Sequence, residues 1–203
     1  MSDEHYFSAS PASADERRTV PVRLRGRELE VETAAGVFSH GRLDLGTQVL
    51  LRTVPEPPDG GHLLDLGCGW GPVAISLALA APRATVWAVD VNERALDLTA
   101  GNARRLGLTG VRAVPPEGVP QEVRFTTIWS NPPIRVGKDV LHELLRAWLP
   151  RLVVGGEAWL VVQRNLGADS LARWLGEELG EGFAVERAAS AKGFRVLRAT
   201  RTT

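Results

Sequence analysis

Hydrophobic positions after residue 60 follow two alternating patterns along the chain. Short apolar runs at residues 62–66, 85–90, 111–114 and 125–130 have the length of buried strands, and each runs into a turn or loop. Longer apolar segments at residues 73–81, 93–106 and 140–149 predict helices. Pro72 opens the first of these helices and Gly107 closes the second. Strands that alternate with helices predict an α/β domain with a mostly parallel, seven-stranded sheet and helices on both faces.

The last third of the chain completes this predicted sheet. Gly155-Gly156 is interpreted as a turn that leads into a strong strand at residues 158–163. A helix pattern around residues 171–179 then precedes two strand candidates at 183–186 and 194–199. Because these two strands follow each other without a helix between them, they predict an antiparallel hairpin that contributes an antiparallel strand at one edge.

Residues 19–33 show a different pattern, in which apolar and polar residues alternate on both sides of Arg25-Gly26. This period of two predicts a small β-hairpin appended to the main domain. The chain is therefore divided into an N-terminal extension, residues 1–60, and an α/β domain, residues 61–203.

Composition indicates the class of protein but does not identify a binding partner. The chain has 203 residues, 44% of them hydrophobic and 24% charged, which is typical of a globular protein. It contains no apolar run of 18 residues and no basic-then-apolar leader, which indicates a cytoplasmic protein without membrane association. The 24 basic and 24 acidic residues cancel, so net charge argues neither for nor against nucleic acid. The basic residues near the end, from Lys192 to Arg201, are interpreted as solvated surface.

Metal and disulfide chemistry are both disfavoured by the residue inventory. The single cysteine, Cys68, excludes an internal disulfide and a cysteine-based zinc site. None of the four histidines has a partner at a spacing typical of metal ligands, so no metal site is predicted.

The run D-L-G-C-G-W-G-P, residues 65–72, joins the first predicted strand of the sheet to its first helix. In a doubly wound sheet this turn lies at the carboxyl edge, where ligands bind. Glycines allow the backbone to turn sharply and to approach a ligand closely. A dinucleotide fingerprint requires a third glycine at position 72, where this chain has Pro72, and the lysine-containing phosphate loop is also absent. The turn therefore indicates a different nucleotide-like ligand.

Two acids accompany this turn. Asp65 precedes it, and Asp90 ends the next strand, where a carboxylate can accept hydrogen bonds from both hydroxyls of a ribose. This combination favours an adenosine without a pyrophosphate, such as S-adenosyl-L-methionine, over an acidic residue that merely ends a strand. Cys68 within the turn is interpreted as a small apolar residue and not as a nucleophile.

The sequence S-N-P-P-I, residues 130–134, follows the predicted strand at 125–130 and reaches the same edge. Proline fixes its own φ and holds the preceding residue extended, and neither proline can donate a hydrogen bond. The side-chain amide of Asn131 and the neighbouring carbonyls therefore form a rigid acceptor site, suited to the hydrogens of an exocyclic or amide NH2. The simpler alternative is a stiff loop. Next to a sulfonium methyl group, such a site would promote methyl transfer mainly by positioning the amine.

These motifs resemble the small-domain class I methyltransferases, and in particular 16S ribosomal RNA guanine-N2 methyltransferases, which take part in rRNA processing. The resemblance rests on segments along nearly the whole chain: H-Y-F at 5–7, G-V-F-S at 36–39, L-D-L-G-T at 43–47, the glycine turn, V-D-V-N-E-R-A-L at 89–96, N-P-P-I-R-V-G-K at 131–138 and G-F-R-V-L-R-A at 193–199. It implies a Rossmann-like fold, S-adenosyl-L-methionine as the cofactor and RNA, ribosomal RNA or the small ribosomal subunit, as the partner of a monomer or homodimer.

The resemblance also implies roles for individual residues. The cofactor would be held by Asp65, Gly67, Cys68, Gly69, Gly71, Asp90, Val91, Glu117, Asn131 and Thr47, with residues 37–47 closing over it. Asn131, Pro132 and Pro133 would grip the reacting amine, and Ile134, Arg135 and Phe38 would contact the substrate.

Several positions depart from the family pattern. Ile134 and Arg135 replace the aromatic residue and the histidine that usually follow N-P-P, and Pro116-Glu117 replaces a Ser-Asp pair. Loss of a base-stacking aromatic weakens binding of a purine unless another aromatic residue substitutes. The sequence therefore leaves open adenine N6, a glutamine amide, or a non-catalytic relative that only binds the cofactor.

Overall fold

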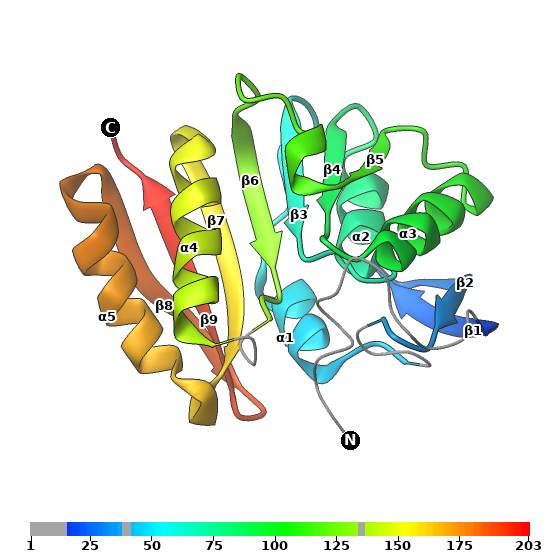
Figure 1. Ribbon diagram of the computed structural model, residues 1–203, viewed down its shortest axis with the longest axis horizontal. Coiled ribbons are helices and arrows are strands. Elements are labelled where there is room, and N and C mark those ends of the chain that lie inside the picture. The colour runs from blue at the N-terminus through cyan, green and yellow to red at the C-terminus, as the bar shows by residue number, and fades with distance from the viewer. Residues whose placement is uncertain (1–15, 38–41, 134–136) are drawn as a thin grey trace.

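The computed structural model describes residues 16–37, 42–133 and 137–203, and its centre is a seven-stranded sheet (Figure 1). The strand order is β5-β4-β3-β6-β7-β9-β8. The strands are β3 (His62–Leu66), β4 (Thr85–Val89), β5 (Val111–Val114), β6 (Phe125–Ser130), β7 (Leu152–Gln163), β8 (Phe183–Ala191) and β9 (Phe194–Arg201). All neighbouring pairs are parallel except those made by β9, which lies antiparallel between β7 and β8. The order reverses between β3 and β6, so the carboxyl ends of these two strands form the topological switch point.

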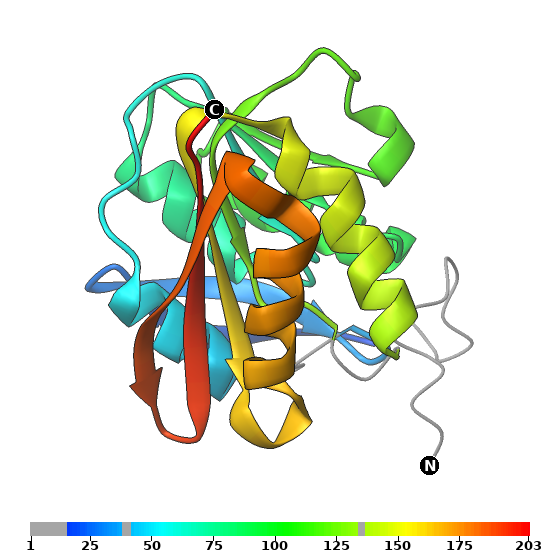
Figure 2. The ribbon, with the colours of Figure 1, turned by 90° about the vertical axis from the view of Figure 1, so that its left-hand side faces the viewer.

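Helices cover both faces of the sheet, and Figure 2 shows the sheet between the two layers. One face packs against α1 (Leu45–Thr53), α2 (Pro72–Ala80) and α3 (Glu93–Arg105), and the other against α4 (Lys138–Trp148) and α5 (Ala168–Leu179). Short 3-10 turns lie at Pro116–Gly118, Leu149–Arg151, Arg164–Leu166 and Gly180–Gly182. Within β3, Leu63 packs on the first face and Leu64 on the second, as the alternation of side chains along a strand requires.

The N-terminal hairpin consists of β1 (Arg17–Leu24) and β2 (Arg27–Ala34) and forms a separate two-stranded sheet. Its turn residues Arg25 and Gly26 have φ values of 48° and 77°, the positive values that a two-residue hairpin turn of type I′ requires. Apolar side chains of the hairpin pack against α2 and α3. The Asn102 side chain of α3 also bonds both the N–H and the C=O of Glu32. The predicted appendage is thereby fixed to the helices that flank the glycine turn.

The predicted fold class is confirmed, and the strands predicted at 62–66, 111–114 and 125–130 have those bounds in the structure. The division of the chain at residue 60 stays a prediction. In the structure, Val49 and Leu50 of α1 share a buried cluster with Val161 of β7.

Gly155-Gly156 does not turn the chain into a strand, and that prediction is wrong. β7 already begins at Leu152, and the two glycines form an irregularity inside it, because the pairing shifts between Phe125–Leu152 and Thr127–Glu157. Gly155 has φ +78°, and a Cβ on Gly156 would lie 3.1 Å from the carbonyl oxygen of Phe125. Glycine is needed here because the neighbouring strand approaches too closely for a side chain.

Two further elements differ from the prediction. β8 continues to Ala191, five residues beyond the predicted end, because its solvent-facing side carries charged and small residues that weaken the strand pattern. Helix α1 was not predicted at all. Its signals are Asp44, which caps the helix by accepting a hydrogen bond from the Thr47 N–H, and apolar Val49 and Leu50 on the buried side.

Candidate active site

The glycine turn and the N-P-P segment lie together at the switch point, because they follow the adjacent strands β3 and β6. A cavity at this edge is lined from three directions. Thr47 of α1 and the cap residue Asp44 lie on one side, and Asn131 follows the end of β6. The turn and the start of α2 contribute Gly67, Cys68, Gly69, Trp70, Pro72 and Val73. The structure thus brings together the two motifs that are 60 residues apart in the sequence.

The glycine turn needs its glycines for two different reasons. Gly67, Gly69 and Gly71 have φ values of 82°, 57° and 94°, which are strained for any other residue. A Cβ on Gly67 would meet no protein atom within 4 Å, so this side of the turn is open. A Cβ on Gly71 would lie 2.9 Å from Thr99 Oγ1, so this glycine allows α2 and α3 to pack closely. Gly67 is therefore suited to contact a ligand, and Gly71 supports the turn.

Asp90 connects the turn to the end of β4. Its Oδ2 accepts a hydrogen bond from the Gly69 N–H at 3.0 Å, and its Oδ1 accepts one from the Asn92 N–H at 3.0 Å. Burial raises the pKa of this carboxyl group above its usual value. Each oxygen keeps a second lone pair. The predicted ribose contact is compatible with this arrangement and stays a prediction.

Asp65 lies behind the turn and is only 1% exposed. Its Oδ2 accepts a hydrogen bond from the Ala74 N–H of α2 at 2.8 Å, so the carboxyl group ties β3 to the first turn of that helix. Burial, with a smaller contribution from the nearby Asp90, raises the pKa of Asp65 to about 8, against the opposing effect of the Ala74 hydrogen bond. Contact between Asp65 and a cofactor stays a prediction.

The raised pKa of Asp65 predicts a pH-dependent stability. Between the ordinary value of 3.8 and about 8, the folded chain keeps the proton that the unfolded chain releases, so the native state loses stability as the pH rises. We expect Asp65→Asn, which retains an acceptor for the Ala74 N–H, to be more stable than the wild type at pH 8. The difference should shrink toward zero at pH 4. Urea unfolding at several pH values tests this, and a difference independent of pH would contradict it.

Cys68 is buried within the turn, and its Sγ accepts a hydrogen bond from Thr99 Oγ1 at 3.5 Å. Burial raises the pKa of the thiol well above its usual value, with Asp90 and Asp65 acting in the same direction. A neutral, buried thiol is a poor nucleophile, which agrees with its interpretation as a small apolar residue.

Val91 and Glu117 lie beyond the ends of β4 and β5, on the same edge as the glycine turn. Val91 is 48% exposed, although it is apolar, and Glu117 is exposed in the 3-10 turn that follows β5. Both positions suit the predicted contacts with the adenosine part of a cofactor. These roles stay predictions.

Asn131 makes the contacts that define the acceptor site. Its Nδ2 donates a hydrogen bond to Asp44 Oδ2 at 2.8 Å and another to Thr47 Oγ1 at 3.1 Å. Both side-chain hydrogens of the amide are thus directed at α1. Pro132 is buried and Pro133 is half-buried, so this part of the segment packs against the rest of the chain. Thr47 was predicted as a cofactor contact, and the structure places it against the Asn131 amide and in the lining of the cavity.

Two residues near Asn131 were missed by sequence reasoning. Asp44 belongs to the L-D-L-G-T segment, and its position as a helix cap is the sequence signal that could have identified it. Phe194 begins β9, and its ring reaches the start of α1, since a Cβ on Gly46 would lie 3.0 Å from Phe194 Cε1 and 3.3 Å from Asn131 Nδ2. The Phe194 ring and the Asn131 amide therefore both lie next to Gly46. The predicted substrate contacts Phe38, Ile134 and Arg135 lie outside the described residues.

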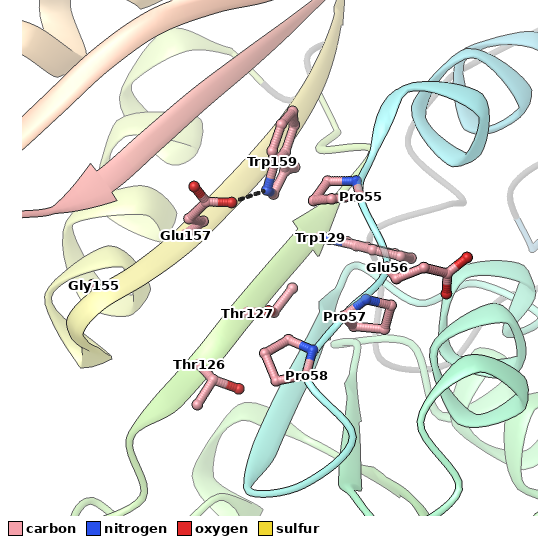
Figure 3. Close-up of a pocket in the computed structure, with 10 residues that line it drawn as sticks. All are labelled: Pro55, Glu56, Pro57, Pro58, Thr126, Thr127, Trp129, Gly155, Glu157 and Trp159. Carbon is pink, nitrogen blue, oxygen red and sulfur yellow. Dashed lines mark hydrogen bonds between the residues drawn. The ribbon is translucent and has the colours of Figure 1, made fainter.

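A second pocket, of about 170 Å³, lies away from this edge, between residues 55–58 and strands β6 and β7 (Figure 3). Trp129 and Trp159 contribute to its walls. Its two carboxylates are engaged: Glu157 accepts hydrogen bonds from Trp159 Nε1 and Arg198, and Glu56 pairs with Arg25. The pocket therefore offers no free acid–base pair, and the switch-point edge remains the candidate active site.

Three arginines near the C-terminus make contacts within the fold. Arg195 pairs with Asp169, and Arg198 pairs with Glu157 and Glu186. Arg201 donates to the carbonyl oxygens of Pro150 and Leu152.

Within the described ranges, no group of three or more His, Cys, Asp or Glu side chains could hold a metal ion. No helix in the part of the chain that the structure describes is long and apolar enough to cross a membrane.

Most of the chain matches one protein family. Residues 28–198 match the family model described as "Methyltransferase small domain". An uncharacterized Bacillus subtilis protein, YbxB, is 35% identical over 97% of this chain and 98% of its own length. The ribosomal RNA small subunit methyltransferase C of Pseudomonas aeruginosa (strain LESB58) is 34% identical over 87% of this chain, which covers 56% of that protein.

A solved structure extends the comparison to the fold. A 16S rRNA N2-guanine methyltransferase of Thermus thermophilus, in complex with AdoMet and guanosine, superimposes with a TM-score of 0.79 at 28% identity. The alignment covers 94% of this chain and 52% of that one. The chain thus spans nearly all of YbxB and about half of the two ribosomal RNA methyltransferases.

Proposed function

Because the chain belongs to the methyltransferase small domain family, we propose that it transfers a methyl group from S-adenosyl-L-methionine to an exocyclic amine, with guanine N2 of ribosomal RNA as the favoured acceptor. The observation that carries this proposal is the orientation of Asn131. Its amide hydrogens are bonded to Asp44 and Thr47, so its Oδ1 is the atom left to accept a hydrogen bond from a substrate.

The cofactor would lie over the open side of the glycine turn. The missing side chain at Gly67 leaves room for it, and Asp90 offers the remaining lone pair of each carboxylate oxygen to two ribose hydroxyls. The cofactor supplies an electrophilic methyl group on a sulfonium. Burial of Asp65 and Cys68 keeps the turn itself free of reactive groups, so binding and orientation are the contributions of these residues.

The acceptor amine would be oriented by hydrogen bonds and not activated by a strong base. Asn131 Oδ1 and a neighbouring backbone carbonyl would accept the two hydrogens of the NH2 group, which leaves the nitrogen lone pair directed away from them. As the new N–C bond forms, the nitrogen becomes more positive and its hydrogen bonds to these acceptors become stronger. The bond from the methyl carbon to the sulfur would break as the N–C bond forms, and one proton would then pass from the positively charged nitrogen to water. Positioning and electrostatic stabilisation of this kind account for large rate accelerations.

Phe194 compensates for the missing aromatic residue after N-P-P in this account. Its ring flanks Gly46 beside the Asn131 amide, and we propose that it stacks on a base whose amine reaches Oδ1. Stacking on an aromatic side chain is worth roughly 1–3 kcal/mol per base. A base held in this way fits the guanine assignment better than a glutamine amide, which has no ring to stack.

We expect Phe194→Ala to raise KM for RNA about tenfold or more, because the stacking contribution is lost. The affinity for S-adenosyl-L-methionine should remain within about threefold, since Asp90 and the glycine turn are untouched, and Phe194→Tyr should behave as the wild type. Steady-state kinetics with RNA and calorimetry with the cofactor measure the two effects. Unchanged KM in Phe194→Ala would show that the base lies elsewhere.

The proposed function is tested by isothermal titration with S-adenosyl-L-methionine, followed by transfer of labelled methyl groups to 16S RNA and to assembled small subunits. We expect micromolar binding and incorporation into at least one of the two substrates. Absence of binding at tens of micromolar would refute the cofactor assignment. Binding without incorporation into any RNA would favour a glutamine amide acceptor or a non-catalytic relative.

A further inference from the structure

The amide of Asn131 is held in one orientation by groups on helix α1. Asp44 Oδ2 lies 2.8 Å from Asn131 Nδ2, and Thr47 Oγ1 lies 3.1 Å from the same nitrogen. We infer that Asp44 is a positioning residue that fixes Asn131 as a hydrogen-bond acceptor, and thereby restricts the methyl acceptor to atoms that carry hydrogens. This inference rests on the proposed function, because it concerns the same site.

The chemistry of a carboxylate explains why the orientation is fixed. An ionised Asp side chain can only accept hydrogen bonds, so it must face the NH2 end of the Asn131 amide. Rotation of the amide by 180° would place Asn131 Oδ1 against Asp44 Oδ2 and replace a charge-assisted hydrogen bond by the repulsion of two acceptors. The oxygen of Asn131 is consequently the end presented to a substrate.

Asp44 is itself held in place by the helix that it caps. The same Oδ2 accepts a hydrogen bond from the Thr47 N–H at 3.0 Å, and the following turn of α1 is anchored in the core by Val49 and Leu50. Gly46 makes the arrangement possible, because a Cβ there would lie 2.9 Å from Asp44 Oδ2 and 3.3 Å from Asn131 Nδ2. Support from a rigid element gives more precise positioning than support from a loop.

This orientation selects among methyl acceptors. An exocyclic amine presents hydrogens to Asn131 Oδ1 and keeps its lone pair for the reaction. A ring nitrogen without a hydrogen, such as guanine N7 or adenine N1, offers no donor to Oδ1. Oδ1 would then be covered by the bound base without a hydrogen bond, which costs about 1–3 kcal/mol. The geometry therefore favours an amine over a ring nitrogen of the same base.

Two substitutions at Asp44 distinguish its role in orienting the Asn131 amide from its role as a helix cap and from the effect of its negative charge. Serine is as good a helix cap as aspartate, but its hydroxyl is one bond shorter and cannot reach Asn131 as well. Asparagine also caps helices, and its single oxygen can accept both bonds that Asp44 Oδ2 accepts now. Asp44→Ser should therefore lose the positioning, whereas Asp44→Asn should keep it without the charge. Asp97→Ser, at an exposed position of α3, serves as the matched control.

The first measurement follows the side-chain amide of Asn131 directly by nitrogen-15 NMR. We expect slow hydrogen exchange of this NH2 group in the wild type, in Asp44→Asn and in Asp97→Ser, and at least tenfold faster exchange in Asp44→Ser. Equal exchange rates in all four proteins would overturn the inference. This readout needs no substrate, so it decides the positioning role even if the protein transfers no methyl group to RNA.

The second measurement is the single-turnover rate of methyl transfer at saturating cofactor. We expect Asp44→Ser to be about 100-fold slower than the wild type, as loss of orientation at a reacting centre typically causes. Asp44→Asn should recover most of that rate, and the melting temperatures should agree among the variants. An Asp44→Asn protein as slow as Asp44→Ser would show that the negative charge acts directly, and would refute the positioning role. Absence of transfer in the wild type would instead refute the proposed function.

Discussion

Replacement of Asn131 by alanine is expected to abolish methyl transfer while leaving the affinity for S-adenosyl-L-methionine within about threefold of the wild type. The side chain offers Oδ1 to the reacting amine, and loss of one such polar group at a reaction centre costs about 100-fold or more in rate. Asp90 and the glycine turn do not contact this amide in the structure, so the cofactor contacts assigned to them remain. Single-turnover transfer to RNA and calorimetric titration measure the two quantities on the same preparation.

Folding of the Asn131 variant must be checked separately, because Asp44 and Thr47 each lose a hydrogen-bond donor. Thermal unfolding of Asn131→Ala alongside Asp44→Asn provides that control. If Asn131→Ala instead loses cofactor affinity as strongly as a variant of Asp90, the N-P-P segment is a cofactor contact and the mechanism is wrong.

The second large effect is expected at Asp90, where alanine should weaken binding of S-adenosyl-L-methionine roughly tenfold to a hundredfold. A hydrogen bond to a charged group is worth about 1.5–3 kcal/mol, and Asp90→Ala removes the proposed ribose acceptors. It also leaves the N–H groups of Gly69 and Asn92 without their carboxylate, so the glycine turn becomes less ordered. Isothermal titration gives the dissociation constant directly.

Asp90→Asn refines this expectation, since an amide keeps one oxygen and loses the second acceptor. Its cofactor affinity should lie between those of Asp90→Ala and the wild type. Unchanged affinity in Asp90→Ala would mean that the carboxylate only supports the turn, and that the ribose is bound elsewhere on this edge.

Much of the fold could be predicted because the sequence signals of its strands and helices lie within or next to each element. The strand at residues 62–66 is a continuous apolar run that ends at a glycine turn, and the helix at 93–105 is bounded by Asn92 as a cap and Gly107. Alternation of such segments dictates a parallel sheet, and a parallel sheet places the ends of β3 and β6 at one edge. The meeting of the glycine turn with Asn131 therefore followed from topology.

The features that escaped prediction depend on contacts between distant segments. Asp44 and Asn131 are 87 positions apart, and nothing near either residue indicates that one orients the other. Phe194 is recognisable as a strand residue, yet its place beside Gly46 follows from β9 running antiparallel next to β7. Gly155-Gly156 has the composition of a turn, and only the close approach of β6 makes it part of a strand.

Helix α1 therefore does more than cover one face of the sheet. It links the segment at 37–47, which was predicted to close over the cofactor, to the amide that would hold the substrate. The N-terminal hairpin joins the same assembly through Asn92, whose Nδ2 donates to the Gly36 carbonyl while its backbone N–H binds Asp90. Residues on the N-terminal side of the chain therefore support both parts of the candidate active site: Gly36 contacts Asn92 on the glycine-turn side, and Asp44 and Thr47 contact Asn131.

We propose that the Asn131 site positions an exocyclic amine for methylation. Its most direct test is mass spectrometry of nucleosides from unmethylated 16S RNA, or small subunits, incubated with the protein and isotopically labelled S-adenosyl-L-methionine. We expect label in N2-methylguanosine, and none when Asn131→Ala replaces the wild type. Label in a ring-nitrogen or ribose methylation product, or equal labelling by Asn131→Ala, would contradict it.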